Sequence, residues 1–183
     1  MVSALSSRYL ANMDLVEVEV MRLGLDRTSN SYVVILQEKG GSRLLPIWIG
    51  QSEAESIVIE MNNLKRERPL THDLCKNIIT AMGGTLRRVH ITKVENRTFF
   101  AEMHVARSTG AVTIDARPSD SIAIALRFAA PIFAQDALLT ALLLDEIQQE
   151  SETLAESGDE MNAEQLKQYL ENLRPEDFGK FHP

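Results

Sequence analysis

The chain has 183 residues, 44% of them hydrophobic and 25% charged, with a formal net charge of −7 at pH 7. No apolar run approaches the ~20 residues of a membrane span, and residues 1–12 lack the basic and apolar parts of a secretory signal. We therefore expect a cytoplasmic globular protein that does not bind a membrane, with one domain and an appendage.

The acidity lies in one part of the chain. Residues 143–183 hold three basic and eleven acidic residues, whereas residues 1–142 hold sixteen basic and fifteen acidic ones. The body is therefore nearly neutral. The single cysteine, Cys75, excludes an internal disulfide, and its apolar neighbours predict a buried structural thiol.

Hydrophobic periodicity predicts an α+β fold. Alternating segments near the N-terminus indicate an antiparallel meander, and a later pair indicates a hairpin. We expect a mixed, mostly antiparallel sheet with helices packed mainly on one face. The domains are then a loose leader at 1–13, a body at 14–142 and an acidic helical C-terminal tail at 143–183. The predicted strands are 14–25, 31–37, 43–49, 85–94, 98–106, 112–116 and 131–134, and the predicted helices of the body are 51–63, 71–82 and 118–128.

The segment Asp115-Ala116-Arg117-Pro118-Ser119-Asp120 lies where a predicted strand gives way to an apolar helix. Pro118 suits the first helical position, and Asp120 in the first turn is favoured by the helix dipole. The polar end of a rigid element is a good place for a functional site. The alternative is that Asp120 only caps the helix and Arg117 only pairs with it. Four residues at helical spacing are expected to face the core: Ile122, Ala125, Leu126 and Ala129.

Two other segments carry similar features. Residues 68–74 read Arg-Pro-Leu-Thr-His-Asp-Leu, with Thr71 as the expected N-cap and Asp73 in the first turn. Residues 45–57 read LPIWIGQSEAESI. Together with RPLTHDL and RPSDSIAIALR, in this order and spacing, this segment resembles the bifunctional nuclease family over residues 14–142. The resemblance implies metal-dependent cleavage of DNA and RNA with little sequence preference, by a homodimer or higher homo-oligomer.

Phosphodiester cleavage needs a nucleophilic water and charge neutralisation at phosphorus, and a divalent ion held by carboxylates supplies both. The candidate ligands for Mg²⁺ or Mn²⁺ are Glu53, Glu55, Asp115 and Asp120. The candidate catalytic residues are Asp120, Glu55, Asp73, His72 and Arg117, with His72 as general base or phosphate ligand. Lys65, Arg66 and Arg68 are candidates for binding nucleic acid.

Each candidate also has a structural interpretation, as a helix cap, an ion-pair partner or a solvated surface residue. A non-catalytic homo-oligomeric regulatory or assembly module therefore remains the alternative function. Trp48 is expected in the core or at an oligomer contact, and His90 has no visible partner in the sequence. A weak internal repeat aligns Glu55-Ser56-Ile57 with Asp120-Ser121-Ile122, and if it is real Glu55 and Asp120 lie near each other.

Overall fold

The computed structural model describes residues 15–26 and 31–140. The chain divides into two units, Met1–Ala141 and Leu142–Pro183, and every described residue belongs to the first. The leader expected at 1–13 and the acidic helical tail expected at 143–183 lie outside the described residues. In the part that is described, no helix is long and apolar enough to cross a membrane.

The described elements agree closely with the expected ones, and most ends shift by one or two residues. The expected helix at 118–128 keeps both its ends, and a short 3₁₀ helix after the last strand was not expected. The elements are β1 (Leu15–Asp26), β2 (Ser31–Glu38), β3 (Leu44–Ile49), α1 (Gln51–Met61), α2 (Thr71–Ala81), β4 (Gly84–Glu95), β5 (Thr98–Arg107), β6 (Gly110–Ala116), α3 (Pro118–Phe128), β7 (Ile132–Gln135) and the 3₁₀ helix η1 (Asp136–Leu138).

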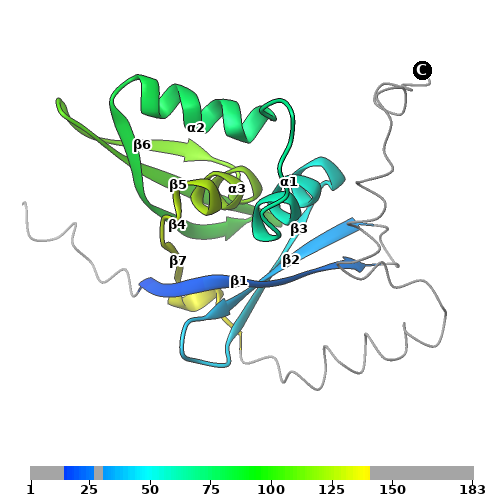
Figure 1. The fold of residues 1–183 in the computed structure, drawn as a ribbon. Helices are drawn as coiled ribbons and strands as arrows, with labels where there is room; N and C mark the ends of the chain where they lie inside the picture. The colour runs from blue at the N-terminus through cyan, green and yellow to red at the C-terminus, as the bar shows by residue number, and fades with distance from the viewer. Residues whose placement is uncertain (1–14, 27–30, 141–183) are drawn as a thin grey trace, which may run out of the picture. The chain divides into compact units, whose positions relative to one another are not determined.

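The seven strands form one sheet in the order β3-β2-β1-β7-β4-β5-β6 (Figure 1). Neighbouring strands are antiparallel except β4 and β7, which run parallel. The short strand β7 therefore joins the meander β1-β2-β3 to the meander β4-β5-β6. The fold is α+β with a mixed, mostly antiparallel sheet, which confirms the expected class.

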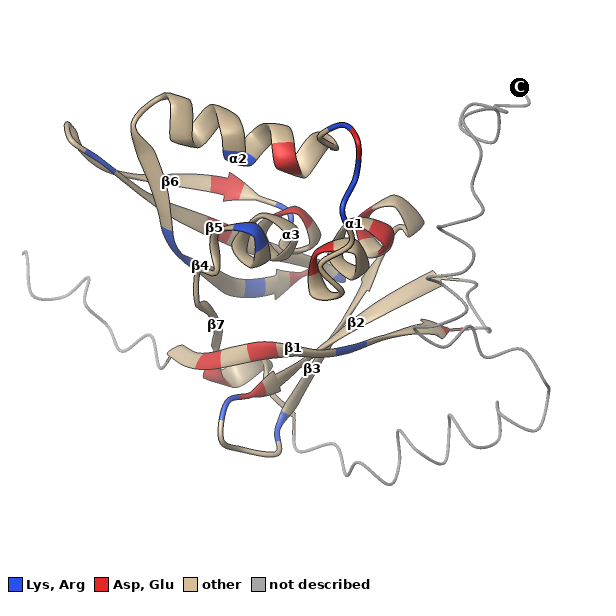
Figure 2. Cartoon of the chain, in the orientation of Figure 1, with Lys and Arg blue, Asp and Glu red and all other residues tan. Residues whose placement is uncertain are grey.

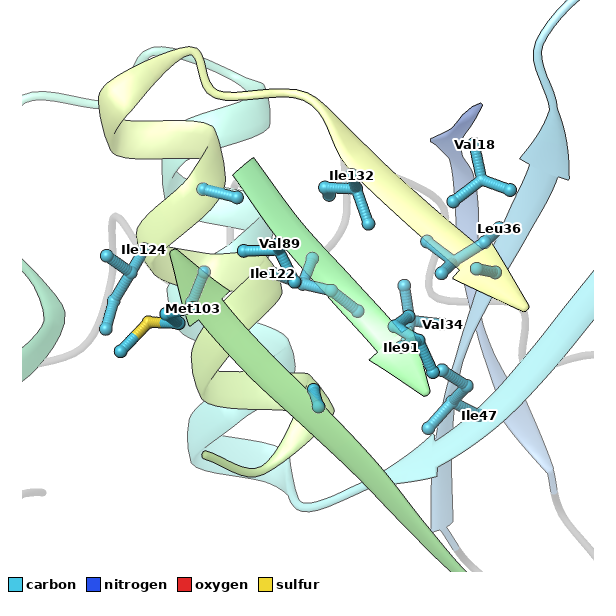
Figure 3. Packing of buried hydrophobic residues seen from close by; sticks show 14 of the residues in the cluster. Val18, Val34, Leu36, Ile47, Val89, Ile91, Met103, Ile122, Ile124 and Ile132 are labelled. Atoms are coloured by element: carbon cyan, nitrogen blue, oxygen red, sulfur yellow. The ribbon is translucent and has the colours of Figure 1, made fainter. Parts of the chain in front are cut away.

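The hydrophobic core lies between one face of the sheet and the helices (Figure 3). Strand alternation directs Val34 and Leu36 of β2 and Val89 and Ile91 of β4 into it, and all four are fully buried. Helix α3 packs against α1, α2, β4 and β5. The small residues of α3 allow these elements to approach it closely. The first turns of α1 and α2 lie near the first turn of α3.

Two expectations about single residues are wrong, Thr71 as an N-cap and Ala129 in the core, and of the two alternatives for Trp48 the core is excluded while an oligomer contact stays a prediction. Trp48 is 54% exposed and donates a hydrogen bond from Nε1 to Asp26 Oδ2 at 3.0 Å, because Leu45 and Ile47 on the same strand take the core-facing positions. The N-cap of α2 is Leu70, since Thr71 already has helical geometry. Ala129 is exposed because it ends α3 in the left-handed region, at φ 48°. Cys75 is half-buried against the core.

Candidate functional site

The first turns of α1, α2 and α3 are joined by a hydrogen-bonded set of side chains that we call the Arg117 cluster: Glu53, Ser56, His72, Arg117 and Asp120. Arg117 precedes α3 as its N-cap, and Asp120 lies in the first turn of that helix. Glu53 lies in the first turn of α1. The α3 and α1 motifs therefore meet, although Arg117 and Glu53 stand 64 positions apart in sequence.

Arg117 joins the two carboxylates. Its Nη2 donates to Glu53 Oε1 at 2.7 Å, and its Nε donates to Asp120 Oδ2 at 2.7 Å. The Arg117 side chain is 66% exposed, whereas those of Glu53 and Asp120 are 17% and 28% exposed. The two carboxylates thus hold the guanidinium in place, and it is still open to solvent. Hydrogen bonds from Arg117 to Asp120 and then to Glu53 raise the pKa of Arg117, so it stays charged.

His72 lies behind Asp120, and both of its ring nitrogens are engaged. Nε2 is 3.0 Å from Asp120 Oδ1, and Nδ1 is 2.7 Å from Ser56 Oγ. An ionised carboxylate only accepts, so Nε2–H is the donor, and in the neutral ring Nδ1 accepts from the Ser56 hydroxyl. Burial raises the pKa of Asp120, but hydrogen bonds from Arg117 and His72 outweigh it and hold that pKa below its ordinary value. Asp120 is therefore a carboxylate at neutral pH.

Asp73, a candidate catalytic residue, forms an ion pair beside this cluster. It accepts the Leu70 backbone N–H at 2.8 Å and the Arg127 Nε–H at 2.6 Å. Arg127 is buried in α3, and its Nη1 donates to the carbonyls of Ala123 at 2.8 Å and Ser56 at 3.3 Å. Burial raises the pKa of Asp73, but the Leu70 and Arg127 hydrogen bonds lower it further than burial raises it. Arg127 thereby ties α1, α2 and α3 together.

The remaining expected site residues lie elsewhere. Glu55 accepts a hydrogen bond from Gln51 Nε2 at 2.9 Å along the same helix. Asp115 pairs across strands with Glu102, on the sheet face that points away from the helices. The exposed basic residues Lys65, Arg66 and Arg68 lie on the loop that joins α1 to α2 and leads into His72 (Figure 2).

A second cluster, which the sequence did not reveal, lies on β4 and β5. His90 Nδ1 lies 3.1 Å from His104 Nε2, and His104 Nε2 lies 3.6 Å from Glu102 Oε2. No partner of His90 was visible in the sequence because its partners come from the neighbouring strand. Burial, then the charges of His104 and Arg88, lowers the pKa of His90 to about 4, so its ring is neutral at pH 7. Among the described residues, His90, Glu102 and His104 form the one group of three or more His, Cys, Asp or Glu residues whose ligand atoms lie close enough together to hold a metal ion.

Ser56 and Arg127 were also missed. Both lie inside apolar helical stretches, where a serine reads as a small packing residue and an arginine as the solvated end of a helix. The weak repeat that aligns Ser56 with Ser121 was the available signal for Ser56, and both serines are buried. The repeat aligns Glu55 with Asp120. In the structure, however, Arg117 joins Asp120 to Glu53, which precedes Glu55 by two positions.

Comparisons with known proteins show the family of this chain. A family model described as the bifunctional nuclease domain matches residues 34–146. An uncharacterized protein of Mycobacterium tuberculosis strain H37Rv is 40% identical over 164 residues, which cover 88% of this chain and 97% of that protein. Bifunctional nuclease 2 of Arabidopsis thaliana is 31% identical over 106 residues, which cover 56% of this chain and 32% of the plant protein. Bifunctional nuclease 1 of Oryza sativa subsp. japonica is 28% identical over 116 residues, which cover 62% and 35%.

Proposed function

Because this chain belongs to the bifunctional nuclease domain family, we propose that residues 14–142 form a nuclease domain that cleaves the phosphodiester bonds of DNA and RNA with low sequence specificity. The observation that carries the proposal is the joining of three helix N-termini in one hydrogen-bonded cluster. The N-terminal end of a helix carries positive partial charge and unpaired backbone N–H groups, which favour phosphate. An exposed arginine held at that point adds a full positive charge.

The accessible groups of the Arg117 cluster suit a phosphodiester. Arg117 presents guanidinium N–H groups that bind phosphate oxygens and stabilise the charge that builds on them during cleavage. Asp120 is ionised and partly exposed beside it, so its carboxylate accepts a hydrogen bond from a water and orients that water toward phosphorus. Glu53 positions Arg117. His72 positions Asp120, because both of its ring nitrogens are already engaged within the protein.

The proposal includes a requirement for a divalent ion, Mg²⁺ or Mn²⁺, which would supply charge neutralisation and an activated water. The four expected ligands do not fit one ion as they stand. Arg117 already occupies the space between Glu53 and Asp120, with contacts of 2.7 Å to each. Glu55 is bonded to Gln51, and Asp115 faces the other side of the sheet. The proposed roles of Arg117 and Asp120 therefore do not depend on an ion held by these four residues.

A cleavage assay tests the proposal. Wild type, Arg117→Ala and Asp120→Asn are purified identically and incubated with single-stranded DNA, duplex DNA and RNA in Mg²⁺, Mn²⁺ or EDTA. Glu55→Gln is the matched control, because Glu55 lies on α1 outside the cluster and accepts a hydrogen bond from Gln51 of the same helix. We expect cleavage by wild type and the control in Mg²⁺ or Mn²⁺ but not in EDTA, with large losses in the two cluster variants even though both remain folded. Equal cleavage by all four proteins, or by none, overturns the proposal.

A second candidate function, a homo-oligomeric assembly module, is favoured by an apolar surface on α2. Leu70, Leu74, Ile78 and Met82 recur every four residues, and each is between 37% and 70% exposed. Such a stripe suits the contact between two copies of the chain. Light scattering of wild type and Ile78→Glu tests this. A dimer or larger species that dissociates in the variant supports the surface as a contact, and a wild-type monomer at all concentrations contradicts it.

A further inference from the structure

The sheet face that points away from the helices carries three side chains with metal-binding chemistry. His90 of β4 is paired directly with Glu102 of β5, and directly paired residues of antiparallel strands point to the same face. His104 follows Glu102 by two positions, so strand alternation keeps it on that face too. Their neighbours Val89 and Met103 point the opposite way, into the core under α3. The register of two strands therefore brings two imidazoles and a carboxylate together.

The spacing of their donor atoms matches a coordination sphere. In a tetrahedral zinc site with bonds of about 2.0–2.1 Å, neighbouring ligand atoms are separated by about 3.3 Å. His104 Nε2 lies 3.1 Å from His90 Nδ1 and 3.6 Å from Glu102 Oε2. All three donor atoms lie within 4.8 Å of one another. Small side-chain movements would bring them onto one ion.

The surroundings hold the two rings in place. His90 is buried, and its ring packs edge-on against Phe133 with centroids 5.8 Å apart. Thr113 Oγ1 lies 3.4 Å from Nδ1 of His104, the nitrogen on the side of the ring away from the cluster. A metal-ligating histidine usually donates its second ring N–H to such a partner, which fixes the tautomer that leaves the first nitrogen free to bind. The rings are thus oriented before any ion arrives.

Charged side chains of both signs lie next to His90, Glu102 and His104. Asp115 is paired directly with Glu102 on the same face, and it adds a second carboxylate beside the site. Arg88 is paired directly with His104 and adds a positive charge. An ion of charge +2 is attracted by the two carboxylates and repelled by the arginine. A substitution of Arg88 therefore tests for a bound cation without removing any of its ligands.

We propose that His90, Glu102 and His104 bind a divalent first-row transition-metal ion on the sheet face that points away from the helices. Imidazole nitrogens suit Zn²⁺ and its neighbours, whereas Mg²⁺ prefers oxygen ligands. Three protein ligands leave a position for water or another ligand. This site is separate from the Arg117 cluster, so the inference holds whether or not the chain cleaves nucleic acid.

Calorimetric titration of the full chain with ZnCl₂, after treatment with EDTA and dialysis, tests the inference. We expect a single Zn²⁺ per chain at this site, and an affinity weakened at least about tenfold in His104→Gln and in Glu102→Gln. His72→Gln, which removes a histidine of the Arg117 cluster, is the matched control and should bind Zn²⁺ as wild type does. MgCl₂ should give no comparable binding.

Two further measurements keep the result decisive if a ligand variant folds poorly. Arg88→Gln removes a repelling charge, so it should bind Zn²⁺ more tightly than wild type. Saturating Zn²⁺ should raise the melting temperature of wild type and Arg88→Gln, but not that of His104→Gln. Absence of Zn²⁺ binding in wild type, or equal binding in wild type, Glu102→Gln, His104→Gln and Arg88→Gln, overturns the inference.

Discussion

Arg117 Nη2 lies 2.7 Å from Glu53 Oε1, and this contact joins the start of α3 to the start of α1. The same guanidinium holds Asp120 through its Nε. The two carboxylates on one cation would repel each other if the arginine were removed, and Arg117 is the most exposed of the three side chains. It therefore organises the cluster and faces any phosphate that approaches.

The first prediction separates these two roles of Arg117. Arg117→Lys keeps the charge but loses the fork that contacts two carboxylates, so activity should fall substantially. Arg117→Ala should reduce kcat/KM on a short single-stranded DNA by about 10²–10³-fold, the usual loss for one donor to a charged transition state. Arg117→Lys should unfold near the wild-type temperature, whereas Arg117→Ala should unfold somewhat below it, because Glu53 and Asp120 lose the cation that they share. Full activity in Arg117→Ala would remove Arg117 from the proposed site.

Local sequence determines most of the fold. The short apolar, β-branched run of β2 and the apolar stretch of α3 identify these elements without any tertiary information. Pro118 at the first helical position marks the start of α3 to the residue. The insertion of β7 between β1 and β4 is different, since it depends on which strands pair over long distances, and local patterns carry no information about that.

The candidate site was less predictable for the same reason. Helix caps and first-turn acids indicate where charged groups gather, so Asp120, Arg117 and His72 are visible in the sequence. That Glu53, and not Glu55, shares Arg117 with Asp120 depends on how α1 is rotated about its axis against α3. His90 acquires its partners through the register of β4 with β5, which its own neighbours in sequence do not reveal.

The β4–β5 hairpin gives a prediction about backbone conformation. Asn96 and Arg97 both have positive φ, 50° and 62°, the pattern of a type I′ turn. Asn suits this conformation, but a side chain such as that of Arg97 costs roughly 1–2 kcal/mol there. Arg97→Gly removes that cost and adds about 0.5–1 kcal/mol of unfolded-state entropy. We expect a net gain of about 0.5 kcal/mol in the free energy of unfolding, measured in urea, and a loss would contradict the turn assignment.

The ion pair between the buried Arg127 and the partly exposed Asp73 should matter more for stability than surface pairs do. Asp73→Ala leaves the buried guanidinium without its charge partner and should cost about 3–5 kcal/mol in the free energy of unfolding. The double variant Asp73→Ala/Arg127→Met should recover part of that loss, because no unpaired charge remains. Lys93→Met is the control, since its pair with Glu95 is exposed and should be worth less than about 1 kcal/mol. Additive losses in the double variant would argue against coupling.

The lowered pKa of Asp73 predicts how stability depends on pH. The folded protein holds this carboxyl below its ordinary value of 3.8, so at mildly acid pH the unfolded chain binds the proton more readily than the folded one. The resulting stabilisation is complete above the unfolded pKa and is lost as pH falls through the lower folded pKa. Asp73→Asn has no such proton to bind. The difference in unfolding free energy between wild type and Asp73→Asn should therefore be constant from pH 7 to about 5 and shrink below about pH 4. Urea unfolding at pH 7, 5, 4 and 3 measures it, and a difference that stays constant throughout would show that the Arg127 pair does not depend on the ionised carboxylate.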